Sequence, residues 1–235
     1  MKRTKPINSE LLKPIEPLTP AQESLWEQYA IGKNLVAYGC AGTGKTFCLL
    51  YQALKEVLTE STPYEKIYIV RSLVPTREIG FLPGTHEDKS FLYQIPYRNM
   101  VKHMFSMYTD KEFDSLYDDL QRQETISFWS TSFLRGTTLD NAIIIVDEFE
   151  NLNFHELDSI MTRVGENSKI FFAGDASQSD LLKVTERTGI LDFMQILNGM
   201  PEFSKVEFGL EDIVRSGLVR SYLVSKINQG YDENI

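Results

Sequence analysis

The segment 39–46, Gly-Cys-Ala-Gly-Thr-Gly-Lys-Thr, constrains the fold of this chain more than any other stretch of the sequence. It matches the pattern G-x-x-x-x-G-K-[ST], with the apolar run 35–38 directly before it and a segment of helical periodicity after it. Glycines at these places let successive backbone N–H groups turn toward one anion, and the N-terminus of the following helix adds favourable charge. The sequence therefore predicts a phosphate-binding loop between a buried strand and a helix.

The pattern also assigns roles to single residues of the loop. We expect Lys45 to reach the β- and γ-phosphates of a nucleoside triphosphate and the Thr46 hydroxyl to coordinate Mg²⁺. ATP and Mg²⁺ are the expected ligands, and the alternative is a glycine-rich turn with an incidental Lys-Thr pair. The residues expected to contact the nucleotide are Gly39, Cys40, Ala41, Gly42, Thr43, Gly44, Lys45 and Thr46.

The composition is that of an ordinary globular protein, with 42% hydrophobic and 24% charged residues in a chain of 235. The formal net charge of −9 argues against a broad basic surface for nucleic acid but leaves room for a local basic track. No stretch approaches the roughly 20 apolar residues that cross a bilayer, so we expect no membrane contact. The two cysteines, Cys40 and Cys48, suit neither a disulfide nor a metal site, and we expect a cytoplasmic protein in which both are buried or half-buried.

Strand and helix signals alternate along most of the chain. Residues 1–18 carry three prolines and are expected to form an extended N-terminal arm, whereas 19–235 is expected to form a single domain. Strands are predicted at 34–38, 66–71, 125–130, 142–146, 169–173 and 205–208. Helices are predicted at 45–58, 90–107, 111–122, 153–164, 186–197 and 211–228, and one more begins after Thr19. Continuously apolar strands suit burial on both faces, so we predict an α/β fold with a doubly wound, mainly parallel sheet and helices on both faces.

Two carboxylates, Asp147 and Glu148, end the apolar run 143–146. Strands often end in acids, so this pattern alone is weak, but after a phosphate-binding loop it is the expected magnesium-binding strand. Asp147 would hold Mg²⁺ through water, and Glu148 would act as the general base for the attacking water. Glu150 is either an extra ligand or a solvated residue at the start of a helix, and the second interpretation is preferred.

Three more polar residues are candidates for the site. Gln178 follows the strand 169–173 and would contact the γ-phosphate and the attacking water, unless the segment is a plain turn. Arg215, near the start of the last predicted helix, is the preferred cation for the charge that develops on the γ-phosphate. Whether Arg215 serves its own chain or a neighbouring subunit stays open. Gln22 would read the adenine edge, and the alternative is a glutamine on a helix surface.

In chain order these motifs resemble the PhoH family of P-loop ATPases. The resemblance runs from about Thr19 to Asn228 and rests on Gln22, GCAGTGKT (39–46), VRS (70–72), GFLPG (80–84), LRG (134–136), VDE (146–148), MTRVG (161–165), GDASQSD (174–180) and EDIVRSGLV (211–219). It implies ATP binding, a RecA-like P-loop NTPase core and the roles given above to the site residues. The compact chain is similar to phage-encoded, phosphate starvation-inducible members of the family.

The chain departs from the family pattern at three places. Cys40 stands where the family commonly has proline, and Ser72 stands where proline usually follows the arginine. After the acidic pair, Phe149 and Glu150 replace an Ala-Gln pair. The residues expected to perform hydrolysis are kept despite these changes.

The resemblance to the first lobe of helicase motors leaves three functions open. The first is an ATPase that remodels RNA or single-stranded DNA, with Arg71, Arg77 and Lys89 along a channel for the strand. The second is an ATP-dependent oligomeric switch that acts on protein partners, which the acidic charge suits better. The third, a small-molecule kinase, is disfavoured by Glu148, because a kinase must keep water out. A single lobe cannot close a nucleotide site between two lobes of one chain, so a homo-oligomer is implied if Arg215 acts on a neighbouring subunit, with a hexamer by analogy to the family.

Overall fold

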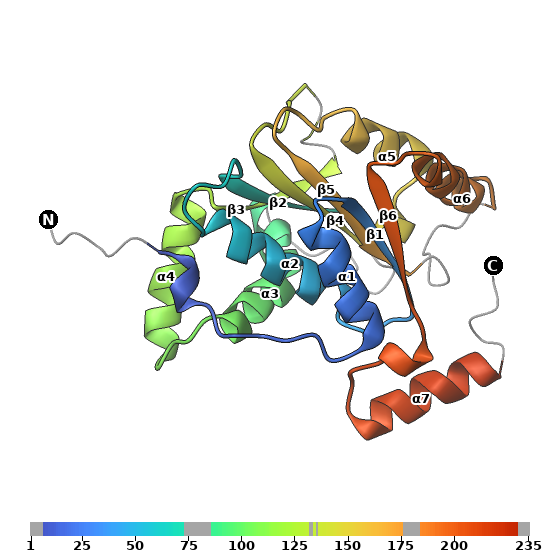
Figure 1. The fold of residues 1–235 in the computed structure, drawn as a ribbon, viewed down its shortest axis with the longest axis horizontal. Helices are drawn as coiled ribbons and strands as arrows, with labels where there is room; N and C mark the ends of the chain where they lie inside the picture. The colour runs from blue at the N-terminus through green and yellow to red at the C-terminus, as the bar shows by residue number, and fades with distance from the viewer. Residues whose placement is uncertain (1–6, 73–85, 132–133, 135, 176–183, 230–235) are drawn as a thin grey trace, which may run out of the picture.

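A single parallel sheet forms the centre of the computed structural model, which describes residues 7–72, 86–131, 134, 136–175 and 184–229. Its six strands lie in the order β3-β2-β4-β5-β1-β6, and every neighbouring pair is parallel (Figure 1). The strands are β1 (Asn34–Gly39), β2 (Lys66–Arg71), β3 (Ile126–Ser130), β4 (Ala142–Asp147), β5 (Lys169–Gly174) and β6 (Phe203–Phe208). Parallel neighbours require a crossover between them, and helices supply most of these crossovers here.

Helices cover both faces of the sheet (Figure 1). One face carries α1 (Pro20–Ala30), α2 (Lys45–Val57), α3 (His86–Met104) and α4 (Asp110–Arg122). The other face carries α5 (Phe154–Met161) and α6 (Val184–Asn198). The last helix, α7 (Gly217–Asn228), buries none of its residues and lies outside both layers. The predicted doubly wound α/β fold of P-loop NTPases is therefore confirmed.

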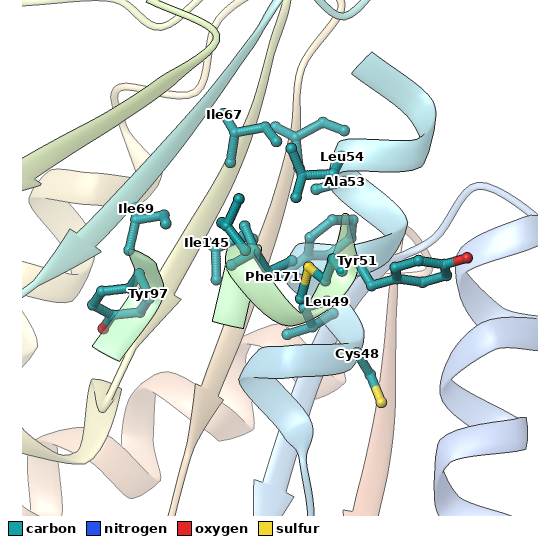
Figure 2. Packing of buried hydrophobic residues seen from close by; sticks show 14 of the residues in the cluster. Cys48, Leu49, Tyr51, Ala53, Leu54, Ile67, Ile69, Tyr97, Ile145 and Phe171 are labelled. Carbon is teal, nitrogen blue, oxygen red and sulfur yellow. The ribbon is translucent and has the colours of Figure 1, made fainter. Parts of the chain in front are cut away.

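The two cores follow from the alternation of side chains along each strand. In β4, Ile143 and Ile145 face the core under α2, whereas Ile144 and Val146 face the core under α5 and α6. Figure 2 shows α2 over the first core, with Leu49 and Ala53 near strand residues such as Ile145. Every residue of β4 is buried, which explains why its sequence is apolar without alternation.

Several helix ends differ from the prediction, and the predicted helix 90–107 spans His86–Met104 instead. The predicted helix 153–164 ends at Met161, because the chain turns there and Val164 forms a bridge with Leu139. The predicted terminal helix 211–228 is helical only from Gly217. Before it comes a short 3₁₀ turn and then an extended stretch that crosses the loop after β1.

One carboxylate explains why the chain is not α-helical at 211–216. The side chain of Asp212 accepts hydrogen bonds from the backbone N–H of Gly209 at 2.9 Å and of Ala21 at 3.2 Å. These bonds tie the 3₁₀ turn to the start of α1. The backbone N–H of Val214 then donates to the carbonyl of Gly42 at 3.1 Å, which holds the extended stretch on the loop.

The segment 7–18 runs along the face of the domain that carries α1 to α4. Two backbone hydrogen bonds hold it there, because Ser9 N–H donates to the carbonyl of Leu58 at 3.1 Å and Lys13 N–H donates to the carbonyl of Met104 at 2.8 Å. The hydroxyl of Tyr51 also donates to the carbonyl of Lys13 at 2.9 Å. Among the described residues, no helix combines the length and the apolar composition that crossing a bilayer requires.

Candidate functional site

The loop between β1 and α2 has the backbone shape of a phosphate-binding loop. Gly39, Gly42 and Gly44 have positive φ angles of +111°, +75° and +84°, which side chains other than glycine rarely tolerate. Gly39 also passes so close to the carbonyl of Phe208 in β6 that a Cβ atom there would collide with it. Gly44 is the N-cap of α2, so the amide groups at the helix N-terminus face the interior of the loop.

Lys45 lies folded over this loop. Its ammonium donates to the carbonyl oxygens of Gly39 at 2.8 Å and Cys40 at 2.7 Å, and it lies 5.8 Å from the ring centre of Phe208. Burial lowers the pKa of Lys45, and the carboxylates of Asp175 and its neighbours oppose this shift. The cation is thus positioned in the loop by contacts that phosphate oxygens are able to replace.

Thr46 and Asp147 meet beside the loop. The Thr46 hydroxyl donates to Asp147 Oδ1 at 2.7 Å, and the Tyr97 hydroxyl donates to Asp147 Oδ2 at 2.6 Å. Burial raises the pKa of Tyr97 well above its usual value, and the negative charge of Asp147 raises it further, so Tyr97 stays a donor. A hydroxyl and a carboxylate are hard oxygen donors of the kind that Mg²⁺ prefers.

Thr46 and Asp147 suit Mg²⁺ better than they suit a metal ion whose ligands all come from the protein. The described part of the chain contains no cluster of three or more His, Cys, Asp or Glu side chains that would hold an ion. Mg²⁺ keeps several waters and takes further ligands from substrate phosphates, so one carboxylate and one hydroxyl are enough. Tyr97 was missed by the sequence analysis, since it lies in α3 with no motif around it.

Glu148 forms an ion pair with Arg71. Arg71 Nη2 lies 2.5 Å from Glu148 Oε2, and the Arg71 guanidinium also lies 5.7 Å from the ring centre of Tyr93 in α3. Burial raises the pKa of Glu148, and the Arg71 charge opposes that shift. Arg71 was predicted to line a channel for nucleic acid, and the structure pairs it with the predicted general base. Arg77 and the side chain of Lys89 lie outside the described residues.

Glu150 is buried, which corrects the preferred interpretation of a solvated residue. Its side chain is 6% exposed because a short 3₁₀ turn folds it back over the end of β5. A Cβ on Gly174 would collide with the Glu150 carboxyl and would lie 2.7 Å from a ring carbon of Phe149. Burial raises the pKa of Glu150 to about 8, against the opposing effect of backbone N–H groups of Glu150 and Asp175.

Gln22 and Arg215 both lie on the loop of their own chain. The Gln22 amide donates to the Thr43 carbonyl at 2.8 Å and accepts from Leu18 N–H at 2.8 Å. The Arg215 side chain covers Gly42, where a Cβ would lie 2.9 Å from Arg215 Cγ. No second subunit is needed to bring this arginine to the loop. Gln178 lies outside the described residues.

A pocket of about 420 Å³ opens beside the loop. Its aromatic wall is formed by Trp26 and Tyr51, which are stacked with ring centres 5.8 Å apart and planes 18° apart. The Tyr51 hydroxyl is fixed by the backbone N–H of Ile15 at 3.2 Å, so the N-terminal segment forms part of the wall. The residues around it are Ile15, Glu16, Leu18, Gln22, Trp26, Gly42, Thr43, Gly44, Lys45, Thr46, Phe47, Cys48, Tyr51, Met100, Val214 and Arg215.

The two cysteines behave as the sequence predicts. Cys48 is buried, and Cys40 is half-buried in the loop. Burial raises the pKa of Cys48 to about 12, so this thiol stays protonated and serves as a small apolar residue.

Comparison with known proteins gives one consistent family. The family model described as PhoH-like protein matches residues 14–227. The PhoH-like protein of Bacillus subtilis is 30% identical over 215 residues, which cover 87% of this chain and 60% of that protein. The PhoH-like protein of Mycobacterium leprae is 32% identical over 193 residues, covering 81% and 52% respectively.

One further relative matches over a shorter stretch, and one solved structure matches with low sequence identity. Protein PhoH2 of Bacillus subtilis is 35% identical over 144 residues, which cover 60% of this chain and 31% of that protein. The chain thus spans 31% to 60% of the length of these three relatives. Among solved structures, the DUF1998 helicase MrfA bound to DNA superposes with a TM-score of 0.49 at 11% identity, over 81% of this chain and 27% of MrfA.

Proposed function

This chain belongs to the PhoH-like protein family, and from that premise we propose that it binds ATP with Mg²⁺ and hydrolyses it. The observation that carries the proposal is the Thr46–Asp147 hydrogen bond of 2.7 Å. It joins the first helix turn after the phosphate-binding loop to the end of β4, although 101 positions separate the two residues. A nucleotide phosphate in the loop would then lie beside both oxygen donors of a magnesium site.

The loop residues 39–46 bind the phosphates in this proposal. Backbone N–H groups at the start of α2 would donate hydrogen bonds to the phosphate oxygens. The Lys45 ammonium would exchange its contacts with two backbone carbonyls for contacts with β- and γ-phosphate oxygens. Thr46 and Asp147 would hold Mg²⁺, which when bound neutralises phosphate charge and orients the γ-phosphate. Arg215, on Gly42, places a second cation next to the phosphates.

Glu148 is the proposed general base. Water attacks the γ-phosphorus, its proton passes to the Glu148 carboxylate, and the bond from phosphorus to the ADP oxygen breaks with the electron pair on ADP. Gln178 is proposed to orient this water. A partly buried base with a raised pKa is better matched to proton transfer near neutral pH than an ordinary carboxylate.

The pocket beside the loop is the proposed site of the adenine base. The Gln22 amide has one N–H and one oxygen lone pair left after its two backbone contacts, which suit the donor and acceptor on adenine. Trp26 and Tyr51 supply an aromatic wall next to it. The proposed site of the base is therefore separate from the proposed site of the phosphates.

The test is steady-state ATP hydrolysis together with nucleotide binding. Glu148→Gln is expected to bind ATP as tightly as the parent chain and to hydrolyse it about 10²–10⁴ times more slowly, the usual contribution of a general base. Glu27→Gln on the exposed side of α1 is the matched control, since it removes one acidic side chain that does not line the pocket beside the loop. Normal turnover by Glu148→Gln would show that another group takes the proton.

We also propose that hydrolysis is coupled to the remodelling of RNA or single-stranded DNA. The supporting observation is the Arg71–Tyr93 pair at the edge of the sheet, because a guanidinium beside an aromatic ring suits a phosphodiester and a stacked base. ATP turnover is expected to rise when single-stranded RNA or DNA is added. Unchanged turnover with both polymers would reject the coupling while leaving the ATPase in place.

The alternative proposal is an ATP-dependent oligomeric switch without nucleic acid. It is favoured by α7, which buries none of its residues and leaves Leu218 84% and Tyr222 65% exposed. An isolated helix of this length is marginal in water, so contact with another copy, in a hexamer or a smaller ring, would stabilise it. Sedimentation with and without ATP is the test, and a single species under all conditions would exclude the switch.

A further inference from the structure

The ion pair between Arg71 and Glu148 has a consequence for how the proposed base is controlled. Both side chains are partly exposed, 24% for Arg71 and 38% for Glu148, so other ions are able to reach them. The pair lies at the carboxyl edge of the sheet, where Arg71 is opposite Asp147 in the β2–β4 register. The proposed catalytic carboxylate is therefore bonded to a cation that a ligand could contact from outside.

The strand order fixes the direction in which this pair turns Glu148. β4 has β2 on one side and β5 on the other, and β1 with its loop lies beyond β5. A carboxylate drawn to the end of β2 is thus directed to the side of β4 away from the phosphate-binding loop. The carboxylates that act on the Lys45 ammonium are instead those of Asp175, Glu150 and Asp147.

Both partners of the pair are held in place by further contacts. Glu148 has a left-handed backbone with φ +51° and ψ +47°, and its carbonyl accepts from Asn151 N–H at 3.0 Å. Arg71 has the Tyr93 ring on its guanidinium at 5.7 Å. The backbone of Glu148 and the guanidinium of Arg71 are therefore both held by contacts beyond the ion pair itself.

We infer that Arg71 is a positioning residue that holds Glu148 away from the nucleotide, and that a phosphodiester of single-stranded nucleic acid releases Glu148 by binding Arg71 instead. The inference rests on the proposed ATPase function. A guanidinium binds phosphate as well as carboxylate through two parallel N–H groups, so the two anions compete for one fork. The Tyr93 ring next to the fork offers a face on which a base stacks.

The first test compares ATP turnover at saturating ATP without nucleic acid. Arg71→Ala is expected to raise the basal kcat about three- to tenfold, since removing a half-buried ion pair shifts the Glu148 conformations by about that factor. Single-stranded RNA or DNA is expected to raise turnover of the parent chain but not of Arg71→Ala. Arg71→Lys keeps the charge but not the planar fork, so its basal rate is expected to lie between those of the parent chain and Arg71→Ala.

A second pair of variants addresses Tyr93 and guards against misfolding of Arg71→Ala. Tyr93→Ala removes the ring that fixes Arg71 and is expected to raise the basal kcat about twofold, whereas Tyr93→Phe keeps the ring and is expected to raise it less than Tyr93→Ala does. Raising the salt concentration is expected to increase the basal kcat of the parent chain and not that of Arg71→Ala, because salt screens the ion pair. A purely structural role of Arg71 would not produce this difference.

The outcomes separate the inference from the proposed function. A parent chain that hydrolyses ATP, with Arg71→Ala equally fast or slower, overturns the inference and leaves the ATPase in place. A silent parent chain with an active Arg71→Ala supports it. No turnover by any variant rejects both. If thermal melting shows that Arg71→Ala is not folded, the Tyr93 variants decide. Equal basal rates of Tyr93→Ala and Tyr93→Phe then overturn the inference.

Discussion

The buried carboxyl of Glu150 makes the stability of this protein depend on pH in a way that one substitution removes. Burial raises its pKa to about 8, compared with 4.5 for an ordinary glutamate. The folded chain therefore keeps a proton that the unfolded chain releases. The ionisation of Glu150 leaves the free energy of unfolding unchanged below about pH 4.5. It lowers this free energy as the pH rises from there to about 8, and it has no further effect at higher pH.

The size of this effect follows from the two pKa values. Each pH unit between them costs the folded state about 1.4 kcal/mol, so raising the pH from about 5.5 to about 7.5 costs on the order of 3 kcal/mol. For a chain of this size that corresponds to a fall in Tm of roughly 5–10 °C. Glu150→Gln has nearly the same shape as the protonated acid but does not ionise, and it is expected to lose this part of the pH dependence.

The assay is equilibrium urea unfolding of the parent chain and Glu150→Gln at several pH values. The difference between the two free energies of unfolding isolates Glu150 from all other titrating groups. Glu27→Gln, an exposed acid on α1, is the control for loss of one acidic side chain. Parallel pH curves for the parent chain and Glu150→Gln would refute the reasoning, since Glu150 would then be equally ionised in the folded and unfolded states.

Three further predictions concern the loop, the sheet and the proposed magnesium site. Lys45→Ala is expected to weaken ATP binding at least about tenfold, as measured by calorimetry, because it removes the cation in the loop; unchanged affinity would contradict the proposed phosphate site. Gly174→Ala is expected to lower the free energy of unfolding by about 1–3 kcal/mol, because the new methyl group would collide with Glu150 and Phe149; an unchanged thermal melt would argue against this packing. Tyr97→Phe removes the 2.6 Å hydrogen bond to Asp147 and is expected to change the Mg²⁺ concentration for half-maximal turnover about threefold or more. Lys33→Ala, on the far side of the domain, should leave that value as it is.

Much of the fold is determined by patterns that are contiguous in the sequence. The strand at 66–71 begins and ends as predicted, and the loop 39–46 lies between a strand and a helix as its glycines require. The burial of β4 follows from its unbroken apolar run. These features depend on neighbours within a few residues, where backbone freedom and hydrophobic periodicity act directly.

The terminal helix shows where local reasoning fails. Its predicted start lies in a stretch that Asp212 and Val214 tie to α1 and to the loop, with partners about 170 to 190 positions away. Such contacts override helix propensity, and no periodicity in 211–216 reveals them. The burial of Glu150 has the same origin, since the space it occupies exists only because Gly174 of the neighbouring strand has no side chain.

The backbone shape of the loop was therefore readable from the sequence alone, because glycines at fixed spacing determine how this short segment turns. The tertiary structure decided which residues surround it. Tyr97 on Asp147, Arg71 on Glu148 and Arg215 on Gly42 come from separate elements that only the strand order and the helix packing bring together. A local sequence motif determines which chemical groups a segment offers, whereas the tertiary structure determines which residues those groups contact.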